Sequence, residues 1–103
     1  MTDKVLISDK ISDDGLAVFK NAGIAFDHLP EITQDQIKET IHNYTGWVIR
    51  SRSRATADII ERADKLRVIG RAGVGVDNVD TAAATRKGII VMNTPGGNTT
   101  STA

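Results

Sequence analysis

The chain has 103 residues, 13 basic and 13 acidic side chains, a formal net charge of zero and no cysteine. A chain of this length forms one small domain, and the lack of cysteine excludes a disulfide framework and thiolate chemistry. The sequence contains no run of about 18 apolar residues, and its first residues lack the basic-then-apolar pattern of a signal peptide. We therefore expect a cytoplasmic protein without a membrane partner.

Five short apolar runs alternate with amphipathic segments along the chain. The runs predict strands at residues 5–7, 24–26, 47–49, 68–69 and 89–92. The segments between them predict helices whose N-cap residues are Ser12, Thr33, Thr56 and Asp80. This alternation is typical of an α/β protein with a parallel sheet, right-handed crossovers and helices on both faces. We expect a doubly wound, flavodoxin-like five-stranded sheet in the order 2-1-3-4-5.

The helices carry signals for their ends and their buried faces. Thr33 and Gln36 are spaced as a capping box, and Gly23 is placed as a left-handed helix exit. Another helix is expected to end at Gly88. Helical spacing predicts that the core is faced by Leu16, Phe19, Ile37, Ile41, Tyr44, Ile59, Ile60, Ala63 and Leu66.

Basic residues are concentrated in the middle of the chain. Residues 50–71 carry seven basic and three acidic side chains, whereas residues 1–49 carry four basic and eight acidic ones. This distribution favours an anionic ligand, although a solvated basic helix face would give the same counts. A nucleic-acid partner is not expected, because only 4% of the residues are aromatic and the acidic first half would repel a phosphate backbone.

Three arginines alternate directly after the third expected strand. Arg50, Arg52 and Arg54 would share one side of this segment if it is extended, and Arg71 lies just beyond the fourth expected strand. These strands are neighbours in the expected order, so their loops, together with residues 8–9, open at the edge where small ligands bind. Guanidinium groups bind carboxylate and phosphate bidentately, so we expect a small anionic substrate there. The alternative is that the arginines are only solvated.

A glycine-bracketed turn follows the fourth expected strand. Gly73, Val74 and Gly75 resemble the start of a dinucleotide-binding fingerprint, but Asn78 occupies its third glycine position and the turn does not follow the first strand. We interpret the turn as a nest whose main-chain N–H groups approach an anion. The alternative is that these glycines only permit a positive φ.

No catalytic or metal-binding set is predicted among these residues. His28 and His42 lack a partner acid or cysteine at ligand spacing, and we interpret both as surface histidines. Asp13 and Asp14 are explained by the dipole of the helix that they begin.

Four segments together resemble the D-isomer-specific 2-hydroxyacid dehydrogenases. They are IRSRS at residues 49–53, VIGRAGVGVDNVD at residues 68–80, ATRKGI at residues 84–89 and VMNTPGGN at residues 91–98. The resemblance implies that residues 1–98 form the substrate-binding (lid) domain of such an enzyme. It also implies that residues 99–103 begin a hinge helix towards an absent NAD-binding domain.

The resemblance implies roles for individual residues. The implied substrate-binding residues are Arg50, Ser51, Arg52, Arg71, Gly73, Val74, Gly75 and Asn98. The arginines would face a phosphate and a carboxylate, the N–H groups of the turn would hold the carboxylate, and Val74 would lie near the nicotinamide of NAD. Asn98 would lie at the substrate side of the hinge. The Ser-Arg-Ser sequence and the additional Arg54 favour a phosphorylated substrate.

In the family, the NAD-binding domain, the active-site arginine, glutamate and histidine, and a final helical segment that completes this domain would follow Ala103. We therefore expect a truncated domain that is inactive alone and binds NAD negligibly. Uncovered apolar surface would favour a marginal monomer, or a dimer that exchanges or pairs terminal segments.

Two other kinds of protein share the expected topology. A free-standing flavodoxin-like module that binds a phosphorylated metabolite without catalysis is the alternative. A receiver or flavin domain is excluded, because Arg50 stands where a receiver needs an aspartate and residues 8–11 lack a phosphate-binding loop.

Overall fold

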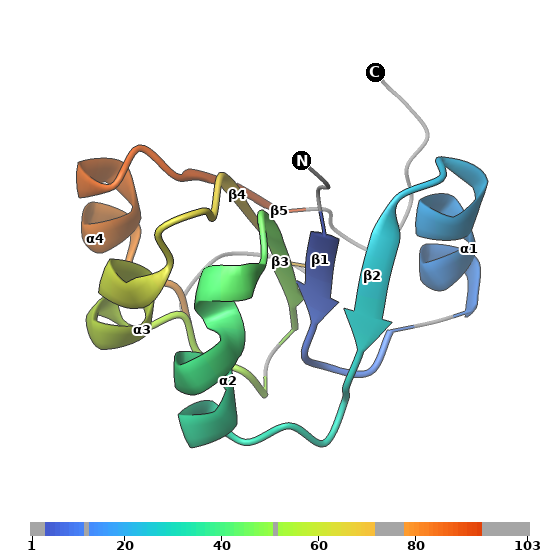
Figure 1. Ribbon diagram of the computed structural model, residues 1–103, viewed down its shortest axis with the longest axis horizontal. Coiled ribbons are helices and arrows are strands. Elements are labelled where there is room, and N and C mark those ends of the chain that lie inside the picture. The colour runs from blue at the N-terminus through green and yellow to red at the C-terminus, as the bar shows by residue number, and fades with distance from the viewer. Residues whose placement is uncertain (1–3, 12, 51, 72–77, 94–103) are drawn as a thin grey trace.

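The computed structural model describes residues 4–11, 13–50, 52–71 and 78–93. Within these ranges the chain forms five strands, four α-helices and one 3-10 helix (Figure 1). Their bounds are β1 (Lys4–Ile7), α1 (Asp13–Asn21), β2 (Ala25–His28), α2 (Gln34–Thr40), η1 (Ile41–Asn43), β3 (Gly46–Ile49), α3 (Ala57–Arg62), β4 (Val68–Arg71), α4 (Thr81–Arg86) and β5 (Ile90–Asn93). The sheet is parallel throughout, with the order β2-β1-β3-β4-β5. The predicted fold class and strand order are confirmed.

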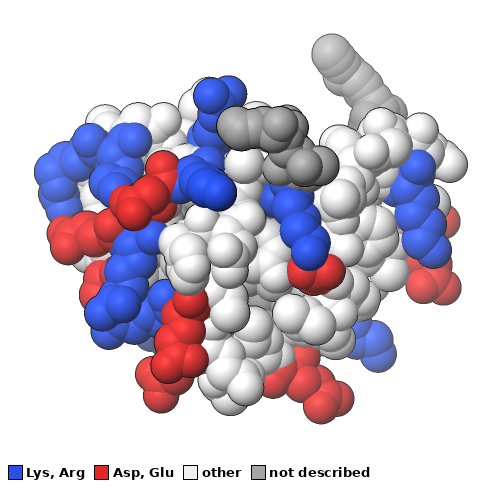
Figure 2. Space-filling model, in the orientation of Figure 1, with Lys and Arg blue, Asp and Glu red and all other residues white. Residues whose placement is uncertain are grey.

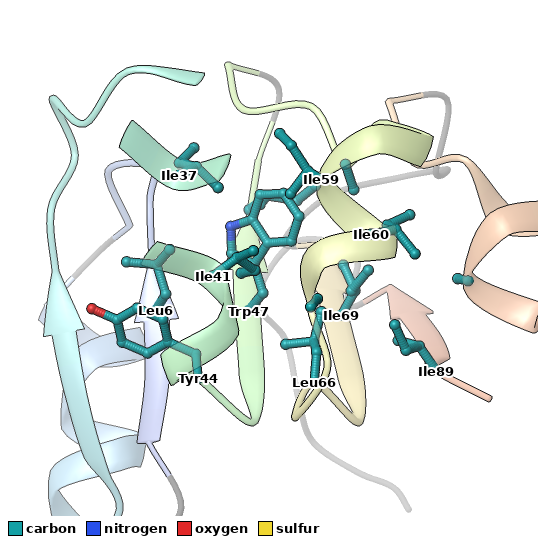
Figure 3. Packing of buried hydrophobic residues seen from close by; sticks show 14 of the residues in the cluster. Leu6, Ile37, Ile41, Tyr44, Trp47, Ile59, Ile60, Leu66, Ile69 and Ile89 are labelled. Carbon is teal, nitrogen blue, oxygen red and sulfur yellow. The ribbon is translucent and has the colours of Figure 1, made fainter. Parts of the chain in front are cut away.

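The sheet separates two unequal helical layers. In Figure 1, α2, α3 and α4 lie on one side of the sheet, and α1 lies on the other side beside β2. Leu6, Trp47 and Ile69 occupy matching positions on adjacent strands and belong to the buried core under the larger layer (Figure 3). On the smaller side, the rings of Phe19 and Phe26 contact each other with centroids 5.8 Å apart.

Most residues expected to face the core do so. The buried ones from the larger helical layer are Ile37, Ile41, Tyr44, Ile59, Ile60, Ala63 and Leu66. Burial of a large aliphatic side chain contributes about 1.5–3 kcal/mol, so this layer supplies most of the hydrophobic stabilisation. Leu16 and Phe19 are only half-buried, and α1 has no fully buried residue, because it covers the sheet beside β2 alone.

Helix ends agree with the sequence at Thr33, at Asp80 and at the positive-φ glycines Gly23 and Gly88, and they differ at Thr56 and Tyr44, while Ser12 lies outside the described residues. Thr33 and Gln36 form the expected capping box, and the side chain of Asp80 caps α4 by accepting the N–H of Ala83. Thr56 occupies the N-cap position of α3, but its hydroxyl donates to the carboxylate of Asp58 instead of capping. The prediction that one helix continues from Thr33 through Tyr44 is wrong, because α2 ends at Thr40 and a 3-10 turn follows.

The edge strand β5 leaves apolar side chains exposed on the side of the sheet that carries α1. Val91 packs against the core, so Ile90 and Met92 face the opposite way, and they are 63% and 51% exposed. None of the helices in the described ranges has the length and apolar character that a bilayer span requires.

Candidate functional site

The carboxyl ends of β3 and β4 bring two arginines to one edge of the sheet. Ile49 of β3 is the parallel partner of Arg71 of β4, and Arg50 follows Ile49 directly. Asn78 links the two loops: its Nδ2 donates to the carbonyls of Arg50 at 2.5 Å and Ser53 at 2.6 Å, and its Oδ1 accepts from Arg71 Nε at 2.7 Å. Arg50 and Arg71 therefore lie at the same edge, where the strand order predicted an anion site, and Asn78 joins the main chain of Arg50 to the side chain of Arg71.

The loop after β1 places a buried aspartate at the same edge. Asp9 is 2% exposed. Its Oδ2 accepts the main-chain N–H of Arg50 at 2.6 Å and that of Ser53 at 2.9 Å, and its Oδ1 accepts the Ser53 hydroxyl at 2.6 Å. A buried carboxylate is stable only when its acceptor positions are filled in this way. Asp9 thus ties the arginine-bearing loop to the end of β1.

A chain of side-chain hydrogen bonds ends at this carboxylate. The indole Nε1 of Trp47 donates to Ser8 Oγ at 2.8 Å, and Ser8 Oγ lies 2.7 Å from Ser53 Oγ. Because Ser53 donates its proton to Asp9, Ser8 must be the donor to Ser53. All of these bonds therefore point their hydrogens towards Asp9.

The pKa of Asp9 lies below its ordinary value of 3.8. Burial acts to raise this pKa, but the hydrogen bonds from the side chain and main chain of Ser53, the main-chain N–H of Arg50 and the charge of Arg52 together lower it. Asp9 is consequently a carboxylate at neutral pH, and it adds a fixed negative charge beside the arginines.

The guanidinium of Arg52 joins three loops. Its Nη1 donates to the carbonyl of Ser8 at 3.1 Å and lies 3.5 Å from Asp9 Oδ1, and its Nη2 donates to the carbonyl of Ile32 at 2.7 Å. The chain bends at Arg52 and Ser53, so the extended segment that would place Arg50, Arg52 and Arg54 on one side is not formed. Arg52 is half-exposed, but two of its donor nitrogens already hold protein oxygens.

Arg50 presents its guanidinium to solvent. Within the part of the chain that the structure describes, this group makes one hydrogen bond, from Nη1 to the carbonyl of Lys10 at 3.3 Å. The main chain of Arg50 is held by Asp9 and Asn78, so the residue combines a fixed backbone with available donors. This combination suits a ligand-binding arginine.

The basic residues away from this edge are interspersed with acids. Figure 2 shows Lys and Arg side chains over α3 and α4 with acidic side chains among them. Lys87 Nζ lies 3.2 Å from Asp64, and Lys38 Nζ lies 3.2 Å from Asp58. The solvated-face interpretation therefore fits the helices, whereas Arg50 and Arg71 belong to the sheet edge.

Several predicted site residues lie outside the described residues. These are Ser51, Gly73, Val74, Gly75 and Asn98. The predicted residues that the structure does place are Arg50, Arg52 and Arg71, and all three lie at the carboxyl edge.

The sequence placed Asp9, Ser53 and Asn78 in loops at this edge, but it did not indicate the role of any of the three. The sequence does contain a signal for Asp9, because a charged residue close behind a continuously apolar strand is placed at the carboxyl edge of the sheet. The contacts themselves connect positions 41 and 44 residues apart, which local patterns do not report.

The two histidines differ from each other. His42 is exposed as predicted, whereas His28 is half-buried, and its buried Nε2 has no hydrogen-bond partner among the residues that are described. His28 is the last residue of β2, which extends two positions beyond its predicted end. It lines an open groove between the β2–α2 loop and α2. In the described ranges, no group of three or more His, Cys, Asp or Glu residues could hold a metal ion.

Comparisons with known proteins agree with this architecture. Residues 5–103 match the model of the family described as "D-isomer specific 2-hydroxyacid dehydrogenase, catalytic domain". The chain is 44% identical over 100 residues to D-3-phosphoglycerate dehydrogenase of Homo sapiens and 42% identical over 103 residues to that of Bacillus subtilis. In both comparisons the alignment covers 97% of this chain and 19% of the relative, so the chain spans about a fifth of the length of these relatives.

Solved structures show the same likeness. The PH0520 protein from Pyrococcus horikoshii superposes with a TM-score of 0.85 at 26% identity, over 93% of this chain and 28% of that one. The NAD+-bound 3-phosphoglycerate dehydrogenase of Entamoeba histolytica gives a TM-score of 0.80 at 26% identity, over 93% of this chain and 34% of that one.

Proposed function

This chain belongs to the D-isomer-specific 2-hydroxyacid dehydrogenase family, and we propose that it is the substrate-binding part of a cytoplasmic, NAD-dependent D-3-phosphoglycerate dehydrogenase. The complete enzyme would oxidise 3-phosphoglycerate to 3-phosphohydroxypyruvate in serine biosynthesis. The observation that carries the proposal is that Arg50 and Arg71 lie at one sheet edge, where Asn78 bonds the main-chain carbonyl of Arg50 and the Nε of Arg71. The relatives named D-3-phosphoglycerate dehydrogenase support the choice of substrate.

Substrate recognition follows from the chemistry of this edge. A phosphorylated hydroxy acid carries a phosphate and a carboxylate, and guanidinium groups pair with either one bidentately. Arg50 supplies solvent-facing donors on a fixed main chain, and Arg71 adds positive charge from the neighbouring strand. We extend the proposal to Ser51, to the main-chain N–H groups of residues 73–75 and to Asn98.

The described residues do not fit the pyrophosphate of NAD. After β1, where a dinucleotide site would need bare N–H groups, Asp9 places a buried carboxylate that would repel phosphate, and the Ser8 hydroxyl is held by Trp47 and Ser53. We therefore propose that other parts of the complete enzyme bind NAD and that Val74 lies beside the nicotinamide. In this proposal, the chain alone binds NAD negligibly and turns over no substrate.

Residues 1–98 would form the lid domain, and residues 99–103 would begin the hinge. The exposed Ile90 and Met92 of β5 give the isolated chain an apolar surface that favours self-association. We propose a marginal monomer or a dimer that exchanges or pairs terminal segments. A concentration-independent monomeric mass in sedimentation would contradict the dimer.

The experiment that tests the anion site is a titration of the ¹⁵N-labelled chain with 3-phosphoglycerate, followed by NMR. We expect saturable shifts that Arg50→Gln abolishes. Arg62→Gln is the matched control, because Arg62 is an exposed arginine in the last turn of α3, away from the carboxyl edge. Equal shifts in wild type and Arg50→Gln would refute the site, and steady turnover of 3-phosphoglycerate with NAD by the chain would refute its inactivity.

A further inference from the structure

A single carboxylate oxygen closes the loop that carries the exposed arginine. Oδ2 of Asp9 accepts the main-chain N–H groups of both Arg50 and Ser53, at 2.6 Å and 2.9 Å. One buried atom therefore holds the main chain at both Arg50 and Ser53. Its conformation depends on a group in a different loop, 41 positions earlier in the sequence than Arg50.

The second oxygen of this carboxylate engages the neighbouring arginine. Oδ1 of Asp9 accepts the Ser53 hydroxyl at 2.6 Å and lies 3.5 Å from Nη1 of Arg52. Arg52 also donates to the carbonyls of Ser8 and Ile32, so its guanidinium connects the loops after β1 and β2 to its own loop. A ligand anion would have to compete for this guanidinium with a carboxylate that is already in place.

We propose that Asp9 is a positioning residue for the anion site, and that Arg52 is its counterion and a loop clamp instead of a ligand-binding arginine. The inference rests on the proposed function, since it assigns parts within the same site. Asp9 fixes the main chain at Arg50, and the Arg50 side chain then meets the anion with little conformational freedom left to lose.

The direction in which anion affinity changes when Asp9 is replaced distinguishes a positioning role from a purely electrostatic one. Asp9 is a negative charge close to the proposed anion site, so removing it raises the local positive potential and on that ground alone strengthens anion binding. Loss of positioning acts in the opposite direction, because a binding group that is no longer held in place must lose conformational freedom when the anion binds, which weakens affinity. A purely structural role would lower stability and leave the affinity of the folded chain unchanged.

The test measures dissociation constants for 3-phosphoglycerate and for inorganic phosphate by NMR in wild type, Asp9→Asn, Asp9→Ala and Tyr44→Phe. Tyr44→Phe is the control, since it removes a side-chain hydrogen bond just before β3, at the amino end of the sheet. Circular dichroism at each titration condition establishes that the variants are folded. Asp9→Asn keeps the size and one acceptor oxygen, and it serves if Asp9→Ala does not fold.

We expect Asp9→Asn to weaken binding by about threefold and Asp9→Ala by about tenfold, with Tyr44→Phe unchanged, because ordering one long side chain costs an amount of this size. Folded Asp9 variants that bind as tightly as wild type, or more tightly, would overturn the inference and leave the proposed function standing. Wild type that binds neither probe would refute the proposed function, and the inference with it.

The assignment of Arg52 has its own test. If Arg52 acts through Asp9, Arg52→Gln added to Asp9→Asn should weaken binding little beyond the single Asp9 variant. Arg50→Gln added to Asp9→Asn should abolish it. If the losses of binding free energy from Asp9→Asn and Arg52→Gln are additive, Arg52 contacts the anion directly and the assignment is wrong.

Discussion

The phenol of Tyr44 donates a 2.7 Å hydrogen bond to Oδ2 of Asp27, and Lys4 Nζ lies 3.0 Å from the same oxygen. The pKa of Tyr44 is raised, first by burial and then by its hydrogen bond to Asp27. We predict that Tyr44→Phe lowers the free energy of unfolding by about 0.5–1.5 kcal/mol, the usual net value of such a bond. Urea denaturation measures this loss. The loss should nearly vanish in an Asp27→Ala background, which removes the acceptor, and full additivity of the two changes would contradict it.

Acid should destabilise the fold through two carboxylates. The pKa of Asp9 is lowered as described above, and that of Asp27 is lowered chiefly by the Tyr44 hydroxyl, with Lys4 adding to the effect. A folded-state pKa below the unfolded value near 3.8 gives stability that is present above that pH and is lost as the pH falls through the folded pKa. We predict a falling urea midpoint below about pH 4. Asp9→Asn and Asp27→Asn should each flatten this acid limb, and an unchanged limb in both would contradict the assignment.

The two N-cap positions predict different outcomes for similar substitutions. Asp80 caps α4 with its side chain, so Asp80→Ala should cost about 0.5–2 kcal/mol of stability. Thr56 makes no side-chain cap, so Thr56→Ala should cost clearly less than Asp80→Ala. The pKa of Asp58, now about 2 with the Thr56 hydroxyl as its first cause, should rise towards 3.8 in Thr56→Ala. NMR titration of the Asp58 carboxyl measures this pKa change. Equal losses of stability in Asp80→Ala and Thr56→Ala would contradict the difference between the two caps.

We predict that the side chain of Asn78 contributes more to the free energy of unfolding than that of an exposed asparagine. Its side chain donates to the carbonyls of Arg50 and Ser53 and accepts from Arg71, so Asn78→Ala removes three hydrogen bonds. We predict a loss of about 1–3 kcal/mol in urea denaturation. Asn43→Ala is the matched control, because Asn43 is exposed, and it should change stability by less than about 0.5 kcal/mol. Similar losses of stability for the two variants would argue against a stabilising role of the Asn78 hydrogen bonds.

The fold was predictable because local signals and global arrangement agree. The capping box of Thr33 and the buried stripe through Ile37, Ile41 and Tyr44 are encoded within a few residues of each other. The early end of α2 was not predictable from that stripe, since the 3-10 turn keeps Ile41 and Tyr44 on the same buried side.

The site was predictable only in part. The meeting of Arg50 with Arg71 follows from neighbouring parallel strands, which the alternation of elements predicts. The attachment of Arg52 to Ser8 and Ile32 does not follow, because a bend in the loop turns its guanidinium towards protein carbonyls. Local sequence carries no record of such long-range partners.

The hydrogen-bonded chain from Trp47 through Ser8 and Ser53 to Asp9 gives the protein a built-in optical reporter. Trp47 is the only tryptophan in the sequence, and its indole N–H belongs to this chain. Its emission should therefore follow rearrangements of the arginine-bearing loop without any attached label. An investigator can watch that loop loosen in acid or tighten around an anion by fluorescence alone.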